Sequence, residues 1–218
     1  MPDPTPLPET KFHFEAIAEL EAPMKKIIES MGDSLPQYDL ILGEDASGRI
    51  PTLVFSEFLK RVKGKRVPTY FYSPGHKRGA LKRRYVLQEY FGRILAREHP
   101  TKPLIVTDYI SSGRTMRWTL DAMKQIGMKP DVVAMARYGN YDKLNDRAKV
   151  WSGGRKEPSV YDAQSFKGVY QVGDPNTPIA SVGQGMLPRL QDINRGREDA
   201  KLLADRLYEW WSERQSSN

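Results

Sequence analysis

Short apolar segments alternate with amphipathic ones from residue 38 to residue 136, and this alternation constrains the fold more than any other feature of the sequence. Four apolar runs are typical of buried strands and cover 38–43, 67–72, 104–108 and 131–136. Helical spacing of apolar residues predicts a helix in each interval, over 50–62, 85–98 and 115–126. Repeated strand–helix–strand units indicate right-handed parallel crossovers. We therefore expect an α/β fold, an open and mainly parallel sheet with helices on both faces.

The flanking regions divide the chain further. Residues 1–11 are expected to form a flexible arm, because four of the first ten residues are proline. The α/β core is expected over 12–140, beginning with a helix over 12–31 that Pro23 bends or splits. The polar stretch 141–195 predicts a small irregular region, and 196–218 an amphipathic C-terminal helix.

Composition excludes several classes of protein. The chain contains no cysteine, which rules out a disulfide scaffold, a thiolate zinc site and a cysteine nucleophile. It has 34 Lys and Arg against 27 Asp and Glu, and the net charge of +7 favours anionic partners, either phosphorylated metabolites or nucleic acid. The N-terminal residues resemble no signal peptide and no apolar run is long enough to span a membrane, so we expect a cytoplasmic protein.

The segment 104–115 carries the most specific chemical signal. An apolar strand delivers one carboxylate, Asp108, and a turn of small hydroxyl residues with Gly113 then opens into a helix. Free amides at a helix start bind phosphate, and glycine lets the anion approach the backbone closely. A carboxylate just upstream suits the hydroxyls of a sugar rather than its phosphate, because like charges repel. These residues together predict a sugar-phosphate site.

The same segment, LIVTDYISSGRTM, resembles the ribose-phosphate-binding motif of type I phosphoribosyltransferases. Asp108 matches the second of the two acids in that motif, and Thr107 stands in place of the first. The resemblance assigns residues 111–115 to the 5-phosphate loop. The residues implied to bind 5-phosphoribosyl-1-diphosphate (PRPP) are Thr107, Asp108, Tyr109, Ile110, Ser111, Ser112, Gly113, Arg114 and Thr115.

Two further loops match the resemblance by their position. The loop after the first strand is similar to the diphosphate loop of the family and comprises Asp45, Ala46, Ser47, Gly48 and Arg49. The basic segment 73–84 follows the second strand, where the family has a loop that closes over the diphosphate. Within it, Lys77 and Arg78 are the candidates to neutralise the leaving group.

The resemblance implies a phosphoribosyltransferase that uses PRPP and Mg2+ to glycosylate a nitrogen acceptor, a nucleobase by expectation, with release of diphosphate. Asp108, Lys77 and Arg78 would be the catalytic residues, and Mg2+ would be held through PRPP and water without a direct protein ligand. The acceptor would bind in a hood over 141–195, and candidate acceptor-binding residues are Arg137, Tyr138, Tyr170 and Gln171. Members of this family usually self-associate, so a homodimer is expected.

Two alternatives remain open from the sequence. The first keeps the fold without the reaction, as a regulator that binds a nucleotide or PRPP, and Thr107 in place of an acid supports it. The second is a nucleic-acid-binding protein that uses the basic segment 73–84, although no RNA- or DNA-binding motif is evident.

Overall fold

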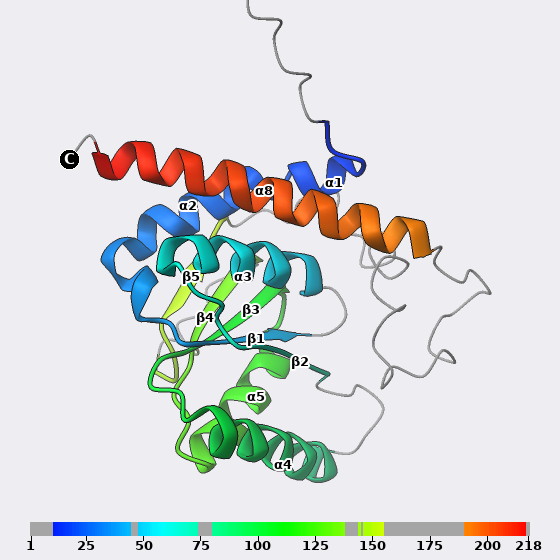
Figure 1. Ribbon diagram of the computed structural model, residues 1–218. Helices are drawn as coiled ribbons and strands as arrows, with labels where there is room; N and C mark the ends of the chain where they lie inside the picture. Colours follow the sequence, from blue (N-terminus) through cyan, green and yellow to red (C-terminus); the bar gives the residue numbers. More distant parts are fainter. Residues whose placement is uncertain are drawn as a thin grey trace, which may run out of the picture.

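The computed structural model describes residues 11–44, 48–73, 80–137, 144, 146–154 and 190–216, with only the backbone described at 80–83 and 190–193. These residues form three layers, a sheet between two layers of helices (Figure 1). The elements in chain order are α1 (Glu15–Ala18), α2 (Glu21–Met31), the 3-10 helix η1 (Gly32–Gln37), β1 (Leu40–Glu44), α3 (Arg49–Lys63), β2 (Thr69–Tyr72), α4 (Ala80–Glu98), β3 (Pro103–Ile110), α5 (Arg114–Gln125), β4 (Asp131–Arg137), β5 (Val150–Ser152) and α8 (Leu190–Ser216).

The sheet is open and has five strands in the order β2-β1-β3-β4-β5. Every neighbouring pair in it is parallel. The α/β fold expected from the sequence, an open parallel sheet with helices on both faces, is therefore confirmed. Strand β1 lies between β2 and β3, with Gly43 in register with Phe71 of β2 and with Val106 of β3.

Residues that alternate along each strand point to opposite faces, so each face has its own core. Ile41 of β1 and Leu104 of β3 belong to a cluster with α1, α2, α3 and α8. Leu42 and Ile105, one position along, belong to a cluster with α4 and α5. In Figure 1 the same two groups of helices lie on opposite sides of the sheet.

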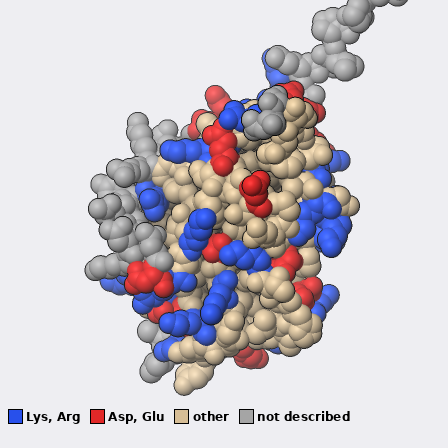
Figure 2. Space-filling view, turned by 90° about the vertical axis from the view of Figure 1, so that its left-hand side faces the viewer, with Lys and Arg blue, Asp and Glu red and all other residues tan. Residues whose placement is uncertain are grey.

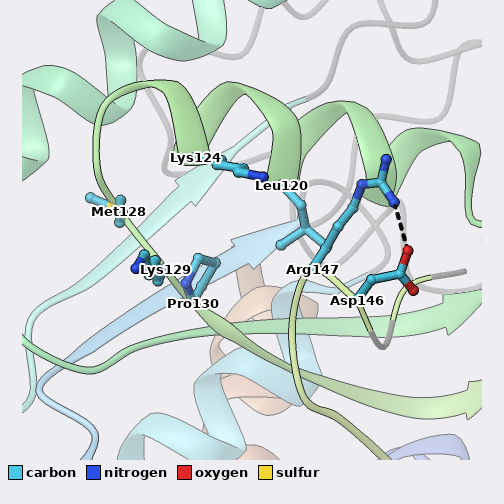
Figure 3. A pocket seen from close by; sticks show the side chains of 7 residues that line it. All are labelled: Leu120, Lys124, Met128, Lys129, Pro130, Asp146 and Arg147. Carbon is cyan, nitrogen blue, oxygen red and sulfur yellow. Dashed lines mark ion pairs between the residues drawn. The ribbon is translucent and has the colours of Figure 1, made fainter.

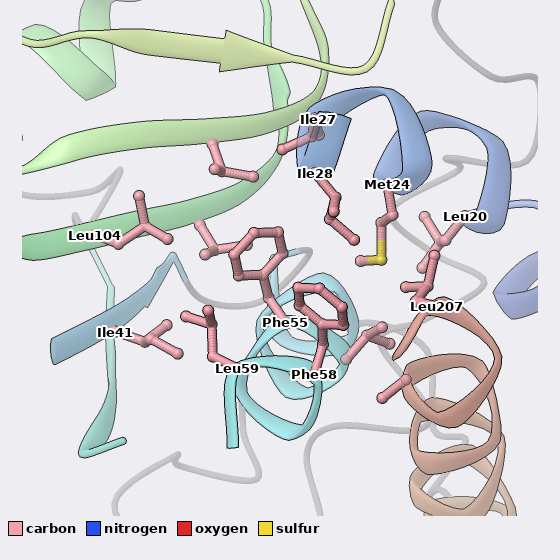
Figure 4. Packing of buried hydrophobic residues seen from close by; sticks show 14 of the residues in the cluster. Leu20, Met24, Ile27, Ile28, Ile41, Phe55, Phe58, Leu59, Leu104 and Leu207 are labelled. Atoms are coloured by element: carbon pink, nitrogen blue, oxygen red, sulfur yellow. The ribbon is translucent and has the colours of Figure 1, made fainter. Parts of the chain in front are cut away.

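Aromatic side chains of α3 belong to the core cluster on this face of the sheet (Figure 4). Phe58 is fully buried and makes edge-to-face contacts with Phe55 and Trp211, with ring centres 6.1 and 6.3 Å apart. Met24 and Leu207 approach the same cluster from α2 and α8. This contact fixes α3, whose N-terminus borders the carboxyl ends of β1 and β3.

The two ends of the described chain are joined by one carboxylate. Asp199 of α8 is 1% exposed and accepts hydrogen bonds from the backbone amides of His13 and Phe14, at 3.0 and 2.8 Å. The ring nitrogen Nδ1 of His13 lies 2.8 Å from the same carboxylate. Asp199 therefore satisfies free amides beside α1 from the far end of the sequence.

Several element boundaries differ from those expected. The N-terminal helix is interrupted before α2 rather than at Pro23, which occupies the first turn of α2, where its missing N–H is not needed. The strand expected over 104–108 continues to Ile110, so Asp108 lies within β3. The region 141–195, expected as an irregular hood, contributes β5 to the sheet, and most of the remainder lies outside the described residues. The C-terminal helix begins at Leu190, earlier than expected.

Charged side chains are mixed on the face that Figure 2 shows. Lys and Arg are interspersed there with Asp and Glu and with uncharged surface. The net positive charge is thus not gathered into one continuous patch on this face. Within the described part of the chain, no helix is both long enough and apolar enough to cross a membrane.

Candidate functional site

The strand order places a topological switch point between β1 and β3. From β1 the chain passes through α3 to β2 on one side, and from β3 it passes through α5 to β4 on the other. In open parallel sheets, ligands bind beyond the carboxyl ends of the strands at such a point. The two loops selected from the sequence follow β1 and β3, so the topology brings them to the same edge.

The turn between β3 and α5 has the conformation that its glycine permits. Gly113 is the N-cap of α5 and has φ +62°, the left-handed region that other residues rarely adopt. Its carbonyl accepts the first helical hydrogen bond, from the amide of Arg117 at 2.9 Å. The side chains of Ser111 and Ser112 are exposed, Thr115 is half-buried, and Ser112 Oγ accepts a hydrogen bond from the Arg114 amide at 3.4 Å. Exposed hydroxyls and the start of α5 thus face outward at the switch point, as an anion site requires.

Gly48 brings the start of α3 against β3. A Cβ atom at this position would lie 2.6 Å from the carbonyl oxygen of Glu44, 3.1 Å from that of Val106 and 3.2 Å from Thr107 Cα. Any larger residue would push the two loops apart. Of the other residues expected to bind diphosphate, Asp45, Ala46 and Ser47 lie outside the described residues.

Arg49 is held at the start of α3. It is 7% exposed, and its guanidinium carbon lies 5.5 Å from the centre of the Phe71 ring. This packing positions the cation beside β2 and keeps most of its side chain away from water.

Two carboxylates meet at the end of the sheet. The hydroxyl oxygen of Thr107 lies 3.0 Å from Glu44 Oε2 and 3.2 Å from Asp108 Oδ1. Thr107 and Asp108 are 1% and 7% exposed. Thr107 stands where the sequence motif has its first acid. A carboxylate from the neighbouring strand, that of Glu44 in β1, lies beside it.

Glu44 has an unusual proton affinity. Burial raises the pKa of its carboxyl from the ordinary 4.5 to about 7, the hydrogen bond from Thr107 opposes the shift, and the charge of Asp108 adds to it. Burial also raises the pKa of the adjacent Tyr72 hydroxyl, with the charge of Glu44 acting in the same direction. The edge therefore holds a carboxyl group that titrates near neutral pH.

The other expected site residues are placed as follows. Tyr109 and Ile110 complete β3, and Arg137 ends β4 directly beside Ile110. Arg137 is thus one strand away from Asp108, at the same edge of the sheet. The remaining residues of this group lie outside the described part of the chain: Lys77, Arg78, Tyr138, Tyr170 and Gln171.

No metal-binding cluster is present in the part of the chain that the structure describes, since no group of three or more His, Asp or Glu side chains gathers there. The acids at the switch point are two, Glu44 and Asp108. Mg2+ commonly keeps several waters and takes few protein ligands, so an ion that arrives with a phosphorylated ligand needs no direct ligand from these two side chains.

Glu44 was not among the residues selected from the sequence. Glu44 alternates with Leu40 and Leu42 in β1, which places it on the sheet face that α4 and α5 cover. This alternation is the sequence pattern from which its burial could have been predicted. Its proximity to Thr107, however, depends on the register of β1 with β3.

A pocket of about 310 Å³ lies away from this edge (Figure 3). It is lined by Leu120, Lys124, Met128, Lys129, Pro130, Asp146 and Arg147. Lys129 and Pro130 immediately precede β4, so the pocket lies at the amino end of that strand. Arg147 is paired there with Asp121 at 3.0 Å and with Asp146 at 3.7 Å. The pocket is therefore separate from the switch point.

Comparison with known proteins gives similarities of structure only. No protein-family model and no curated protein matches the chain. An orotate phosphoribosyltransferase from Aeropyrum pernix is similar with a TM-score of 0.40 and 12% identity, over 63% of this chain and 72% of that one. A purine phosphoribosyltransferase from Pyrococcus horikoshii has a TM-score of 0.37 and 14% identity, over 66% and 90%. A hypothetical protein from Neisseria gonorrhoeae with bound ppGpp has a TM-score of 0.41 and 14% identity, over 62% and 78%. At these low values, the function has to be inferred from the residues of the site.

Proposed function

We propose that this protein is a phosphoribosyltransferase that uses PRPP and Mg2+ to glycosylate a nitrogen acceptor, with a nucleobase as the acceptor class, and releases diphosphate. One observation carries the proposal. The starts of α3 and α5 lie at the same switch point, where Gly48 packs against Thr107 and the buried Asp108 adjoins the turn at Gly113. Two helix starts and an acid at one edge suit a ligand with two phosphate groups and a sugar between them.

The proposed roles follow the chemistry of each group. The turn 111–115 binds the 5-phosphate through backbone amides and hydroxyls. Gly48 and the start of α3 bind the diphosphate, and Asp108 accepts hydrogen bonds from the ribose hydroxyls. As the bond from the anomeric carbon to diphosphate breaks and the bond to nitrogen forms, positive charge develops on the ribose, and the carboxylate of Asp108 stabilises it.

Four further groups complete the proposal. Mg2+, when bound, would neutralise diphosphate oxygens and assist the departure of the leaving group. Lys77 and Arg78 are proposed to cover that leaving group. Arg137, which is in register with Ile110, is proposed to contribute to the acceptor side of the site. A homodimer is part of the same proposal.

The test is diphosphate release in the presence of PRPP, Mg2+ and a panel of nucleobases. Asp108→Asn should lower turnover by about 10²–10³-fold while the far-UV circular dichroism spectrum is unchanged. Asp121→Asn is the matched control, because Asp121 lies on α5 and pairs with Arg147 away from the switch point. Equal turnover in Asp108→Asn and the control would contradict the role given to Asp108.

A second candidate function is a regulator that binds PRPP or a nucleotide without turnover. The observation that favours it is Thr107, which places a neutral hydroxyl where a charged group would otherwise stabilise the transition state. Calorimetry separates the two candidates. Binding of PRPP without diphosphate release across the panel selects the regulator, and release with any base selects the enzyme.

A further inference from the structure

The hydroxyl of Thr107 lies between two carboxylates, and this geometry limits how they can be protonated. Its oxygen is 3.0 Å from Glu44 Oε2 and 3.2 Å from Asp108 Oδ1. A hydroxyl carries one proton, so it donates to one carboxylate and presents a lone pair to the other. If Glu44 is protonated, it donates to Thr107, and Thr107 donates to ionised Asp108. Both short contacts are then hydrogen bonds, which two ionised carboxylates would not allow.

The surroundings of Glu44 favour the neutral form. The groups that shift its pKa are burial, the Thr107 hydroxyl and the negative charge of Asp108, and none of these is a cation. From β2, Tyr72 faces Glu44 and is 3% exposed. From α3, the charge of Arg49 lies over the Phe71 ring.

A pair of hydroxyls extends this uncharged environment. Thr119 of α5 is fully buried, and its hydroxyl and that of Tyr72 have no hydrogen bond of normal geometry within the described residues. Both groups are neutral, so they bring no positive charge that would stabilise ionised Glu44.

We propose that Glu44 and Asp108 share one proton through Thr107, and that an anionic ligand binds at this edge together with a proton. A negative charge brought close to Glu44 increases its affinity for the proton. By linkage, the proton increases the affinity for the ligand to the same extent. The identity of the ligand, PRPP with Mg2+, rests on the proposed function, whereas the shared proton is a property of the free protein.

Calorimetry in two buffers of different ionisation enthalpy measures the linked proton directly. At pH 7.5, titration of PRPP and Mg2+ should show uptake of a fraction of a proton, and Kd should rise by up to about tenfold per pH unit above neutrality. Glu44→Gln resembles the protonated acid and should lose both the uptake and this pH dependence. Glu89→Gln, at a side chain that is 72% exposed on α4, should retain them. Binding with equal proton uptake in wild type and Glu44→Gln would overturn the inference.

A titration of the free protein keeps the test independent of PRPP and of the variant. Carbon-13 NMR of labelled glutamate carboxyls, with Glu44 assigned through its backbone, should give a midpoint near 7. A midpoint at the ordinary glutamate value overturns the inference. If Glu44 titrates near neutral pH but the protein binds no PRPP, the shared proton is supported and the proposed function is contradicted. If the protein turns over PRPP while Glu44 titrates at the ordinary glutamate value, the proposed function is supported and the shared proton is contradicted.

Discussion

Replacing Glu44 by glutamine should change how the stability of the protein depends on pH. The carboxyl has a pKa of about 7 in the folded protein and an ordinary value of 4.5 in the unfolded chain. Between these values the folded protein binds more protons than the unfolded chain, so the free energy of unfolding falls as pH rises. This contribution is complete below the unfolded value and is lost as pH rises through the folded value. Glutamine has no proton to lose and removes the dependence.

The size of the effect follows from the shift. A difference of 7 − 4.5 = 2.5 units corresponds to about 3 kcal/mol, of which roughly 2–3 kcal/mol falls between pH 5 and pH 8. Urea unfolding followed by tryptophan fluorescence, at several pH values in that window, should therefore show wild type losing this amount relative to Glu44→Gln. The control Glu89→Gln should follow wild type, because its side chain is mostly exposed. If the curves of wild type and Glu44→Gln stay parallel across the window, Glu44 is an ordinary solvated acid and the reasoning is refuted.

Three substitutions and one control test the packing of the site and of the core. Gly48→Ala places a methyl group 2.6 Å from a backbone oxygen and should lower stability by about 1–3 kcal/mol. Its control, Gly92→Ala on α4, has open space around the new methyl group and should stabilise by about 0.5–1 kcal/mol. Equal shifts of the two variants in thermal unfolding would contradict the close contact at Gly48. Gly113→Ala, at φ +62°, should cost about 1–2 kcal/mol and weaken PRPP binding measured by calorimetry, and unchanged values for both would show that the turn relaxes freely. Phe58→Ala removes a fully buried ring and should cost about 3–5 kcal/mol in urea unfolding, and a loss below 1 kcal/mol would show that α3 and α8 repack around the space.

The core of the fold was predictable because its signals are local. The strands of the central sheet are apolar runs flanked by glycine or polar turns, and their alternation with helices implies parallel pairing. Strand β5 escaped prediction because it has three residues, and only Trp151 in it is buried. A segment this short is recognised by its pairing with β4 rather than by a sequence pattern.

The site was predictable in part, for the same physical reason. Asp108 and Gly113 lie in one continuous segment, so strand, acid, turn and helix can be read together. Glu44 lies 63 residues before Thr107, and their contact arises from the register of two strands. Its raised pKa depends on burial that only the folded sheet creates. Neither the contact with Thr107 nor the raised pKa of Glu44 can be predicted from the residues next to Glu44 in the sequence.

The hydrogen bonds that join Asp199 to the residues before α1 also bear on how the protein is made. During synthesis the first helices leave the ribosome nearly the whole chain length before Asp199 does. Until then the amides of His13 and Phe14 have only water as partner, and Leu203 and Leu207 of α8 have yet to cover the apolar residues of α2 and α3. The nascent chain therefore carries an uncovered apolar layer on one side of its sheet, and this layer closes only when α8 is released.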